Sequence, residues 1–282
     1  MIIQRPGWVR PTFQLWVPLA VALIFTLFPF YWMAVTALKP NSELYNPKMM
    51  PLIVHNPTMK HFIDLLTETD FLTWTYNTML VAVVSTAISL IFGIMLAYPL
   101  ARMKFPGAAL IAFAVAATYL VPQPLLFIPM ADIINSLHLG DTLSAVMLTY
   151  PTLLVPFCAW LLMGYFKTVP RDLEDAARID GATQIQTMFR IILPLCTPGF
   201  ISAGIFAFTL AQNEFLYALI FLTDSGVRTV PVGAISELVR GDVFYWGQLM
   251  AAALLGSVPV AIIYSFFVEH YVSGLTAGAV KQ

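Results

Sequence analysis

The sequence predicts an all-α membrane protein with six transmembrane helices and both termini in the cytoplasm. Hydrophobic residues make up 59% of the 282 residues and charged residues only 10%, whereas a soluble globular domain contains about 25% charged residues. The mean hydropathy of the chain is +0.81. The net charge of −1 gives no reason to expect a nucleic-acid partner, because such partners are bound by strongly basic surfaces.

Six runs of the sequence are apolar over the length of about 20 residues that a transmembrane helix needs. They are residues 14–37, 74–101, 108–132, 142–166, 195–222 and 247–271. They divide the chain into an N-terminal segment, a transmembrane domain and a C-terminal tail, at residues 1–13, 14–272 and 273–282. Arg5 and Arg10 precede the first run, and no small-residue cleavage site follows it, so we expect a retained span rather than a signal peptide.

The distribution of positive charge predicts the orientation of these spans. With the N-terminus inside, nine of the 14 lysines and arginines fall in inner segments, and four of these nine lie in the segment 167–194. Cytoplasmic loops of membrane proteins carry an excess of Lys and Arg. The sequence therefore places both termini and the segment 167–194 in the cytoplasm, with the segments 38–73 and 223–246 outside.

The segment 167–194 is the most charged part of the chain, and its first half predicts a short helix. Pro170 suits the first helical turn. Negative charge stabilises a helix N-terminus, and the acids that follow are Asp172, Glu174 and Asp175. One narrow face of this helix is apolar with small side chains, at Leu173, Ala176 and Ala177.

Gly181 separates this helix from a second one. A glycine can end a helix in the left-handed conformation. Thr183 and Gln186 have the spacing of a capping box, which predicts a second helix that ends at Pro194. A pair of short helices with a small-residue face, placed between two spans, is expected to dock against another protein.

The outer segment 38–73 contains several prolines and is expected to be irregular, apart from a short amphipathic helix near Phe62–Leu66. His55 and His61 have no third ligand nearby, which favours surface histidines over a metal site. The acids of this segment are expected to be solvated, at Glu43, Asp64, Glu68 and Asp70.

The third span contains Pro122, Pro124 and Pro129. Prolines within a span leave backbone groups unpaired, which is tolerated where protein or a water-filled cavity satisfies them. These prolines favour a kinked helix that lines a cavity, with a merely bent packing helix as the alternative.

The fifth span combines close packing with buried polarity. A stripe of small residues allows neighbouring helices to approach, at Ala203, Ala207 and Ala211. Polar residues follow it, at Gln212, Asn213, Glu214 and Tyr217. A carboxylate within a membrane span is costly unless it faces a cavity or a partner. The sequence favours two interpretations equally, a substrate pathway or gate on the one hand and an interhelical hydrogen-bond clamp on the other.

Two segments near the C-terminus leave alternatives open. The outer segment 223–246 ends in Phe244, Tyr245 and Trp246, which are expected to form either an interfacial aromatic belt or a contact for an external partner. The tail after residue 272 is short and rich in small residues, so it is expected either to be disordered or to insert between cytoplasmic partners.

The sequence lacks the motifs of an enzyme. It has no G-x-x-x-x-G-K-[ST] phosphate loop, no H-E-x-x-H, no G-x-S-x-G and no Cys/His cluster. Cys158 and Cys196 lie in or beside apolar runs and offer neither a disulfide framework nor a metal site. Glu174 and Asp175 are adjacent on a helix and point about 100° apart, which does not suit a catalytic dyad.

The segment 167–194 resembles the EAA loop of permease subunits of ABC importers, whose pattern is E-A-A-x-x-D-G-A followed by I-x-L-P. The matching residues are Asp175, Ala176, Ala177, Asp180, Gly181, Ala182, Ile191, Leu193 and Pro194. Asp175 stands where the family has glutamate, and Glu174 precedes it as an acidic residue often does there.

Over nearly its full length the chain resembles the smaller maltose-permease-type subunit of carbohydrate importers. Four other segments support this resemblance, PFYWMAVTALKP (29–40), LARMKFPG (100–107), QNEFLYALIFL (212–222) and GLTAGAVKQ (274–282). Gln212 departs from a common tryptophan, and Gln282 from the usual final glycine. The first departure leaves the shape of the substrate path open, and the second is expected to alter the contact of the tail slightly.

The resemblance implies a permease subunit in a bacterial or archaeal inner membrane that binds no cofactor itself. A helix of the EAA loop would be a coupling helix in a cleft of one of two separate P-loop ATPase subunits, which would hold ATP and Mg. A second permease and a periplasmic or lipid-anchored sugar-binding protein would complete the importer. The coupling residues implied are Glu174, Asp175, Ala176, Ala177, Asp180, Gly181 and Ala182.

The same resemblance implies two further sites. The tail would reach the ATPase interface through Gly274, Leu275, Thr276, Ala277, Gly278 and Lys281. The substrate pathway would contain Gln212, Asn213, Glu214 and Tyr217, although the companion permease can carry most substrate contacts in this family.

Two other functions are weighed against an importer. An autonomous secondary transporter would use Glu214 as its proton or ion site, but such proteins show internal repeats and more intramembrane ionisable groups than this sequence has. A membrane scaffold or sensor would use the segment 167–194 only to dock a regulator.

Overall fold

The computed structural model describes residues 12–279, with side chains for residues 14–118 and 120–267. Its regular structure is almost entirely helical, as the composition predicts. The chain divides into two compact units, each made from two stretches of sequence. The first unit comprises Met1–Thr69 and Ala234–Val258, and the second comprises Asp70–Gly233 and Pro259–Gln282.

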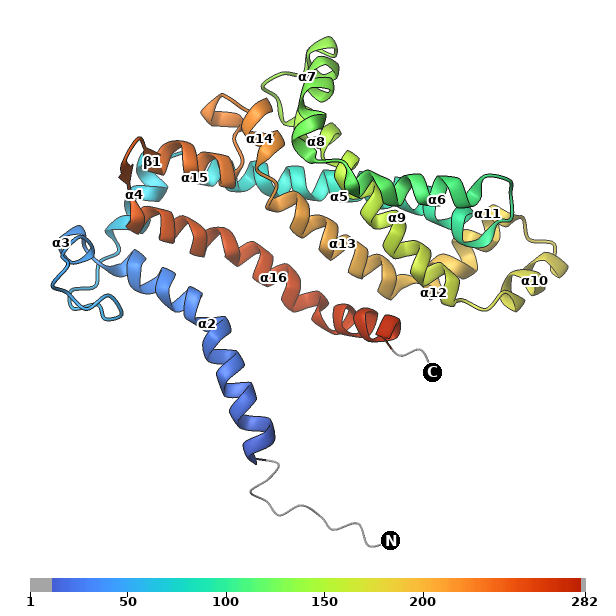
Figure 1. Ribbon diagram of the computed structural model, residues 1–282, viewed down its shortest axis with the longest axis horizontal. Helices are drawn as coiled ribbons and strands as arrows, with labels where there is room; N and C mark the ends of the chain where they lie inside the picture. The colour runs from blue at the N-terminus through green and yellow to red at the C-terminus, as the bar shows by residue number, and fades with distance from the viewer. Residues whose placement is uncertain (1–11, 280–282) are drawn as a thin grey trace, which may run out of the picture. The chain divides into compact units, whose positions relative to one another are not determined.

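Three helices form the core of the second unit, and Figure 1 shows them side by side. They are α5 (Phe71–Arg102), α9 (Pro151–Thr168) and α13 (Thr197–Gln212). Close packing of α5 on α9 depends on Gly93, because a Cβ atom there would lie 2.7 Å from the Cβ atom of Cys158. The predicted small-residue stripe of α13 is buried, with Ala203, Ala207 and Ala211 all within the core.

The third predicted span is broken by its prolines. Helix α6 (Ala108–Ala117) is followed by two short 3₁₀ turns, Thr118–Leu120 and Gln123–Leu126, and then by α7 (Phe127–Ser136). Val121 is extended between these turns, because a residue before proline avoids the helical conformation. Helix α8 (Leu143–Thr149) then runs into α9.

The segment 195–222 holds two helices instead of the one continuous helix expected. Helix α13 ends at Gln212, and α14 (Leu216–Phe221) begins after a short break. The start of α13 is also bent by 77° from the preceding helical run Gln184–Leu195. Prolines flank this bend at positions 194 and 198, and each lies in the first turn of its helix, where no backbone N–H is required.

The loop that precedes α15 (Val230–Leu238) is fixed to residues elsewhere in the second unit. Asp141 accepts hydrogen bonds from the amides of Thr223 (2.7 Å) and Asp224 (3.0 Å). These bonds hold the pKa of Asp141 below its ordinary value, and the bond from the amide of Asp224 has the largest effect. Trp74 of α5 donates its indole N–H to the carbonyl of Ser225 at 3.0 Å. This part of the segment 223–246 is therefore an ordered surface.

The first unit contains α2 (Val17–Leu38), α3 (Asn41–Leu44) and α4 (Lys60–Glu68), with a five-residue π-helical turn, Thr12–Trp16, before α2. Helix α4 contains the amphipathic segment predicted at Phe62–Leu66 and confirms it. Helices α15 and α16 (Trp246–Ala279) contribute residues to both units. Between them lies an antiparallel hairpin that the sequence analysis missed, β1 (Val239–Arg240) paired with β2 (Val243–Phe244).

Two polar residues expected on the surface of the segment 38–73 are buried. Glu43 is only 4% exposed, because its carboxylate accepts hydrogen bonds from the amides of His55 (3.1 Å) and Asn56 (2.8 Å). His61 is 6% exposed, and its Nε2 atom lies 2.9 Å from the carbonyl oxygen of Lys39. The expectation of a solvated Glu43 and a surface His61 was wrong, since short sequence windows do not reveal these long-range partners.

Among the described residues, four helices are long and apolar enough to cross a membrane, and they are Gln14–Leu38, Phe71–Arg102, Leu143–Thr168 and Trp246–Phe267. The bent pair Gln184–Leu195 and Thr197–Gln212 is a fifth candidate. Helix α6 is apolar but shorter. The protein is thus predominantly helical, with several helices of membrane-spanning length.

Candidate coupling surface and central cavity

Helix α10 (Asp172–Ile179) is built as the charge pattern predicts. Its first turn contains three acidic residues and its last turn contains Arg178, so both ends carry the charge that favours the helix dipole. The carbonyl of Arg171 accepts hydrogen bonds from the amides of Glu174 (2.9 Å) and Asp175 (3.1 Å). Pro170 precedes this capping residue and so lies outside the first turn in which it was expected.

Gly181 ends α10 in the left-handed conformation, as predicted, with a φ of +83°. The amide of Ala182 donates to the carbonyl of Ala177 at 2.9 Å, and the amide of Gly181 donates to that of Arg178 at 3.1 Å. These two bonds satisfy carbonyl groups that a helix C-terminus would otherwise leave unpaired. The chain therefore reverses sharply after α10.

The second helix of the loop begins with the predicted capping box. At the start of α11 (Gln184–Thr187), the amide of Thr183 donates to Oε1 of Gln186 at 2.8 Å. The amide of Gln186 donates to Oγ1 of Thr183 at 3.3 Å. The helical run continues through a π-helical turn, Met188–Ile192, and through α12 (Leu193–Leu195). It passes the expected end at Pro194 because this proline lies in the first turn of α12.

Helix α10 has two different faces. Glu174 and Ala177 are 6% and 4% exposed and point into the protein. Asp175, Ala176 and the other residues of the helix are exposed, with Ile179 87% exposed. The small-residue face expected from Ala176 and Ala177 is therefore divided, since only Ala176 is available to a partner.

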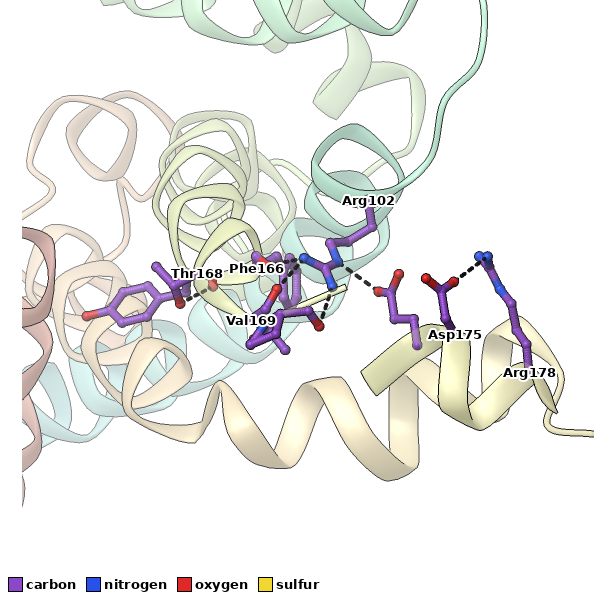
Figure 2. Close-up of polar contacts among 9 residues, drawn as sticks. Arg102, Phe166, Thr168, Val169, Asp175 and Arg178 are labelled. Carbon is purple, nitrogen blue, oxygen red and sulfur yellow. Dashed lines mark hydrogen bonds and ion pairs between the residues drawn. The ribbon is translucent and has the colours of Figure 1, made fainter. Parts of the chain in front are cut away.

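The buried side of α10 is fixed by Arg102, the last residue of α5. Figure 2 shows its guanidinium directed toward the end of α9 and the start of α10. Its Nε donates to Oε1 of Glu174 at 2.7 Å. Its Nη1 donates to the carbonyls of Phe166 (3.0 Å) and Val169 (2.7 Å), and its Nη2 to that of Pro170 at 3.4 Å. We call these five residues the Arg102 cluster.

The other ion pair of α10 is of a different kind. Nη1 of Arg178 lies 3.4 Å from Oδ1 of Asp175, and both side chains are more than half exposed. Exposed pairs of this type contribute about 0.2–1 kcal/mol at most. Asp175 is consequently free to exchange Arg178 for a basic group on another protein at little cost.

A cavity of about 620 Å³ lies in the second unit beside the proline-broken segment. It is lined by the break itself, by the start of α9 and by the end of α13. The proline-broken segment thus lines a cavity, as its prolines predicted. Its polar lining residues are Thr118, Gln123, Tyr150, Thr152, Asn213 and Glu214.

Glu214 lies at this cavity but also stabilises the break after α13. Its Oε1 accepts from the amide of Tyr217 at 2.9 Å, and its Oε2 accepts from the amide of Ala218 at 3.2 Å. Both amides belong to the first turn of α14, whose N-terminus favours negative charge. Glu214 is therefore a capping group of α14 at the wall of a cavity, which differs from the interhelical clamp considered from the sequence.

The other residues predicted for a substrate pathway lie in different surroundings. Asn213 lines the cavity, and its side chain donates to the carbonyl of Thr209 at 2.8 Å. Gln212 and Tyr217 are not among the described residues that line it. Tyr217 is completely buried and stacks on Phe221 with the ring centroids 6.0 Å apart.

We expect Glu214→Ala to loosen α14. Two buried amides lose their acceptor, which costs about 1–2 kcal/mol. Hydrogen exchange at Tyr217 and Ala218, followed by mass spectrometry, should therefore be roughly five- to thirtyfold faster. Asn213→Ala is the control, since its side chain does not bind these amides. Unchanged exchange in Glu214→Ala would show that the capping bonds are unimportant.

The predicted tail site lies largely beyond what the structure describes. Gly274, Leu275, Thr276, Ala277 and Gly278 fall in the last turns of α16, where side chains are not described. Lys281 lies outside the described residues. In the part of the chain where side chains are described, no group of three or more His, Cys, Asp or Glu residues is arranged to hold a metal ion.

Two residues that shape the candidate coupling surface were not recognised from the sequence. Arg102 was interpreted only as part of a basic turn, because its partner Glu174 lies 72 residues away. Ile179 was not recognised as exposed, although it follows Ala176 by three residues on the same side of a helix. This helical spacing was the available signal for Ile179.

Comparisons with known proteins identify the family. Residues 89–276 match the family of binding-protein-dependent transport system inner membrane components. The sulfoquinovosyl glycerol transport system permease protein of Agrobacterium fabrum is 38% identical over 93% of this chain and 91% of that protein. The trehalose/maltose transport system permease protein of Thermococcus litoralis is 35% identical over 92% of each.

The fold is shared with a solved transporter. A chain from the crystal structure of a bacterial ABC transporter involved in the import of the acidic polysaccharide alginate matches with a TM-score of 0.78. The match covers 96% of this chain and 100% of that chain at 18% identity. The protein described here therefore belongs to the family of binding-protein-dependent transport system inner membrane components.

Proposed function

We propose that this chain is the transmembrane permease subunit of an ATP-driven importer for a carbohydrate or glycoside. Its relatives named above are permease proteins for sulfoquinovosyl glycerol and for trehalose/maltose. The observation that carries the proposal is the construction of α10, which has one face fixed inside the protein and an opposite face that exposes Leu173, Ala176 and Ile179 among charged residues. A helix that is fixed on one side and exposed on the other can transmit the movement of a second protein to the rest of this chain.

The exposed face of α10 would be the docking site for an ATPase subunit. Ala176 allows close approach, and Leu173 and Ile179, 39% and 87% exposed, supply apolar contact area. Asp175 and Asp180 would form charge-assisted hydrogen bonds with basic groups of the ATPase, while Gly181 and Ala182 set the turn. ATP and Mg would be held by the ATPase. Glu174, expected to touch the partner directly, would act from inside through Arg102.

Within the membrane, the chain would form half of a translocation pathway. We propose that its third span is the broken segment α6–α7 and its fifth the bent segment up to α14, which gives six spans with both termini in the cytoplasm. The cavity beside Glu214 would form part of the pathway wall, with Asn213, Gln123 and Thr152 as its hydrogen-bonding groups. A second, homologous permease would supply the facing wall.

The remaining partners would bind at the two ends of the chain's spans. The ordered surface at residues 223–230 and the aromatic residues that follow the hairpin would face a periplasmic or lipid-anchored sugar-binding protein. The tail residues Gly274–Gly278 and Lys281 would reach toward the ATPase interface. The complex would lie in a bacterial or archaeal inner membrane.

An arginine at Ala176 tests the docking surface. We expect Ala176→Arg to abolish recovery of the ATPase, because the side chain is exposed and its enlargement blocks close approach without disturbing the core. The measurement is affinity purification of the tagged chain in mild detergent, identification of partners by mass spectrometry, and assay of ATP hydrolysis by the purified complex. The native chain should recover a P-loop ATPase and a second permease.

Thr168→Arg is the matched control, since it places the same side chain at an exposed position at the end of α9. It should leave ATPase recovery unchanged. If the native chain purifies without an ATPase, under conditions that keep other membrane complexes intact, the importer proposal fails. If Ala176→Arg retains the ATPase fully, the docking face lies elsewhere.

A further inference from the structure

The Arg102 cluster joins three helices that are separated in sequence. Arg102 ends α5, Phe166 and Val169 lie at the end of α9, and Glu174 lies in the first turn of α10. A short linker connects α10 to α9 along the chain. Helix α5, in contrast, reaches α10 through the bond of Arg102 to Glu174, across 72 residues of sequence.

The chemistry of this cluster requires an arginine. The last carbonyls of a helix have no intrahelical partner and carry partial negative charge, and Arg102 binds two such groups at the end of α9 with one nitrogen. Another of its nitrogens holds the Glu174 carboxylate. The planar guanidinium presents five donors in a fixed geometry, whereas a lysine ammonium is a single point with three.

Burial makes the ion pair between Arg102 and Glu174 hard to separate. The side chains of Arg102 and Glu174 are only 3% and 7% exposed. Separating them would leave two charges buried and unpaired, which is strongly unfavourable in a medium of low polarity. The exposed Asp175–Arg178 pair on the same helix has no comparable resistance, because water replaces a lost partner there.

We propose that Arg102 is a positioning residue for energy coupling, which makes α5, α9 and α10 move as one rigid body. This inference rests on the proposed docking of an ATPase on the exposed face of α10. Displacement of α10 by that ATPase would pass through Glu174 and Arg102 into the core helices. Without Arg102, α10 would still dock but would move independently of α5.

A pair of spin labels on α5 and α10 tests this directly in the assembled complex. Met95→Cys and Arg178→Cys are exposed sites on the two helices, and the native Cys158 and Cys196 are replaced by alanine. The distance between the labels is measured in lipid nanodiscs, first without nucleotide and then with ATP and vanadate. In the background with native Arg102 it should be the same in both states.

Arg102→Lys should change that result. It keeps the charge but loses the simultaneous bonds, so the distance should broaden and shift between the two states by about 2 Å or more. ATP hydrolysis by the complex should persist. Lys104→Met, at an exposed position two residues away, is the control for removal of a neighbouring charge and should keep the native distances.

The outcomes separate the inference from the proposed function. A narrow, nucleotide-independent distance in Arg102→Lys would overturn the positioning role, even if Ala176→Arg releases the ATPase as expected. If Arg102 served stability alone, Arg102→Lys would yield less assembled complex, and the complex that remained would show the native distances between the labels. If no ATPase is recovered at all, the proposed function fails, while the nucleotide-free broadening still reports whether Arg102 fixes α10.

Discussion

Replacement of Gly93 by leucine is expected to prevent α5 from packing on α9 and to abolish the folded protein. A Cβ atom at this position would lie 2.7 Å from the Cβ atom of Cys158 and 3.4 Å from the backbone nitrogen of Ala159. Overpacking of a well-packed core costs about 1–3 kcal/mol, and more where backbone must move. Detergent-solubilised Gly93→Leu should be recovered in far lower yield and unfold at a lower temperature than the native chain.

Gly93→Ala provides the quantitative version of this prediction. An alanine in a helix interior is favoured over glycine by about 1 kcal/mol, so destabilisation by Gly93→Ala would isolate the packing clash. Gly164 of α9 is the matched control, because a Cβ atom there meets nothing within 4 Å, and Gly164→Ala should be neutral or stabilising. Adding Cys158→Gly removes the clashing Cβ atom, so the double variant should be more stable than the sum of the two single changes predicts. A Gly93→Ala protein more stable than the native one by about 1 kcal/mol would show that α5 and α9 accommodate the added Cβ atom without loss.

The helical fold followed from composition and periodicity, but its interruptions followed only in part. The prolines at positions 122 and 124 predicted the break before α7, because a proline restricts the backbone only at its own position and its immediate neighbours. The break after α13 was missed, because residues 195–222 form one apolar run. It is stabilised by Glu214, which accepts hydrogen bonds from the amides three and four residues ahead of it. This local capping pattern was present in the sequence but was not recognised.

A distinction between local and long-range partners holds for the candidate coupling surface. Gly181 and the Thr183–Gln186 capping box were predicted correctly because their partners lie within a few residues. The inward direction of Glu174 was not predicted, because it depends on Arg102 at the end of a different helix. Long-range ion pairs of this kind leave no periodic signal in a single sequence.

Replacement of Gly181 by valine is expected to disrupt the docking of the ATPase. Residue 181 has a φ of +83°, which a β-branched residue adopts only with strain, and a Cβ atom there would meet no other part of this chain within 4 Å. The expected cost of about 1–2 kcal/mol therefore comes from the backbone. Relief of that strain would redirect the chain between α10 and α11 and displace the exposed face of α10. Recovery of the ATPase with the tagged chain, and ATP hydrolysis by the complex, should both be lost.

Two other substitutions reveal the reason for this effect. Asparagine tolerates the left-handed conformation better than other non-glycine residues, so Gly181→Asn should retain most of the ATPase if backbone conformation is what matters. If Gly181→Asn fails as completely as Gly181→Val, the glycine is required because the ATPase approaches its backbone closely. Gly107 has a φ of +88° and equally open surroundings, and it lies before α6, outside the candidate coupling surface. Gly107→Val imposes similar strain, so it should leave ATPase recovery intact, and its failure to do so would attribute the Gly181→Val defect to general misfolding.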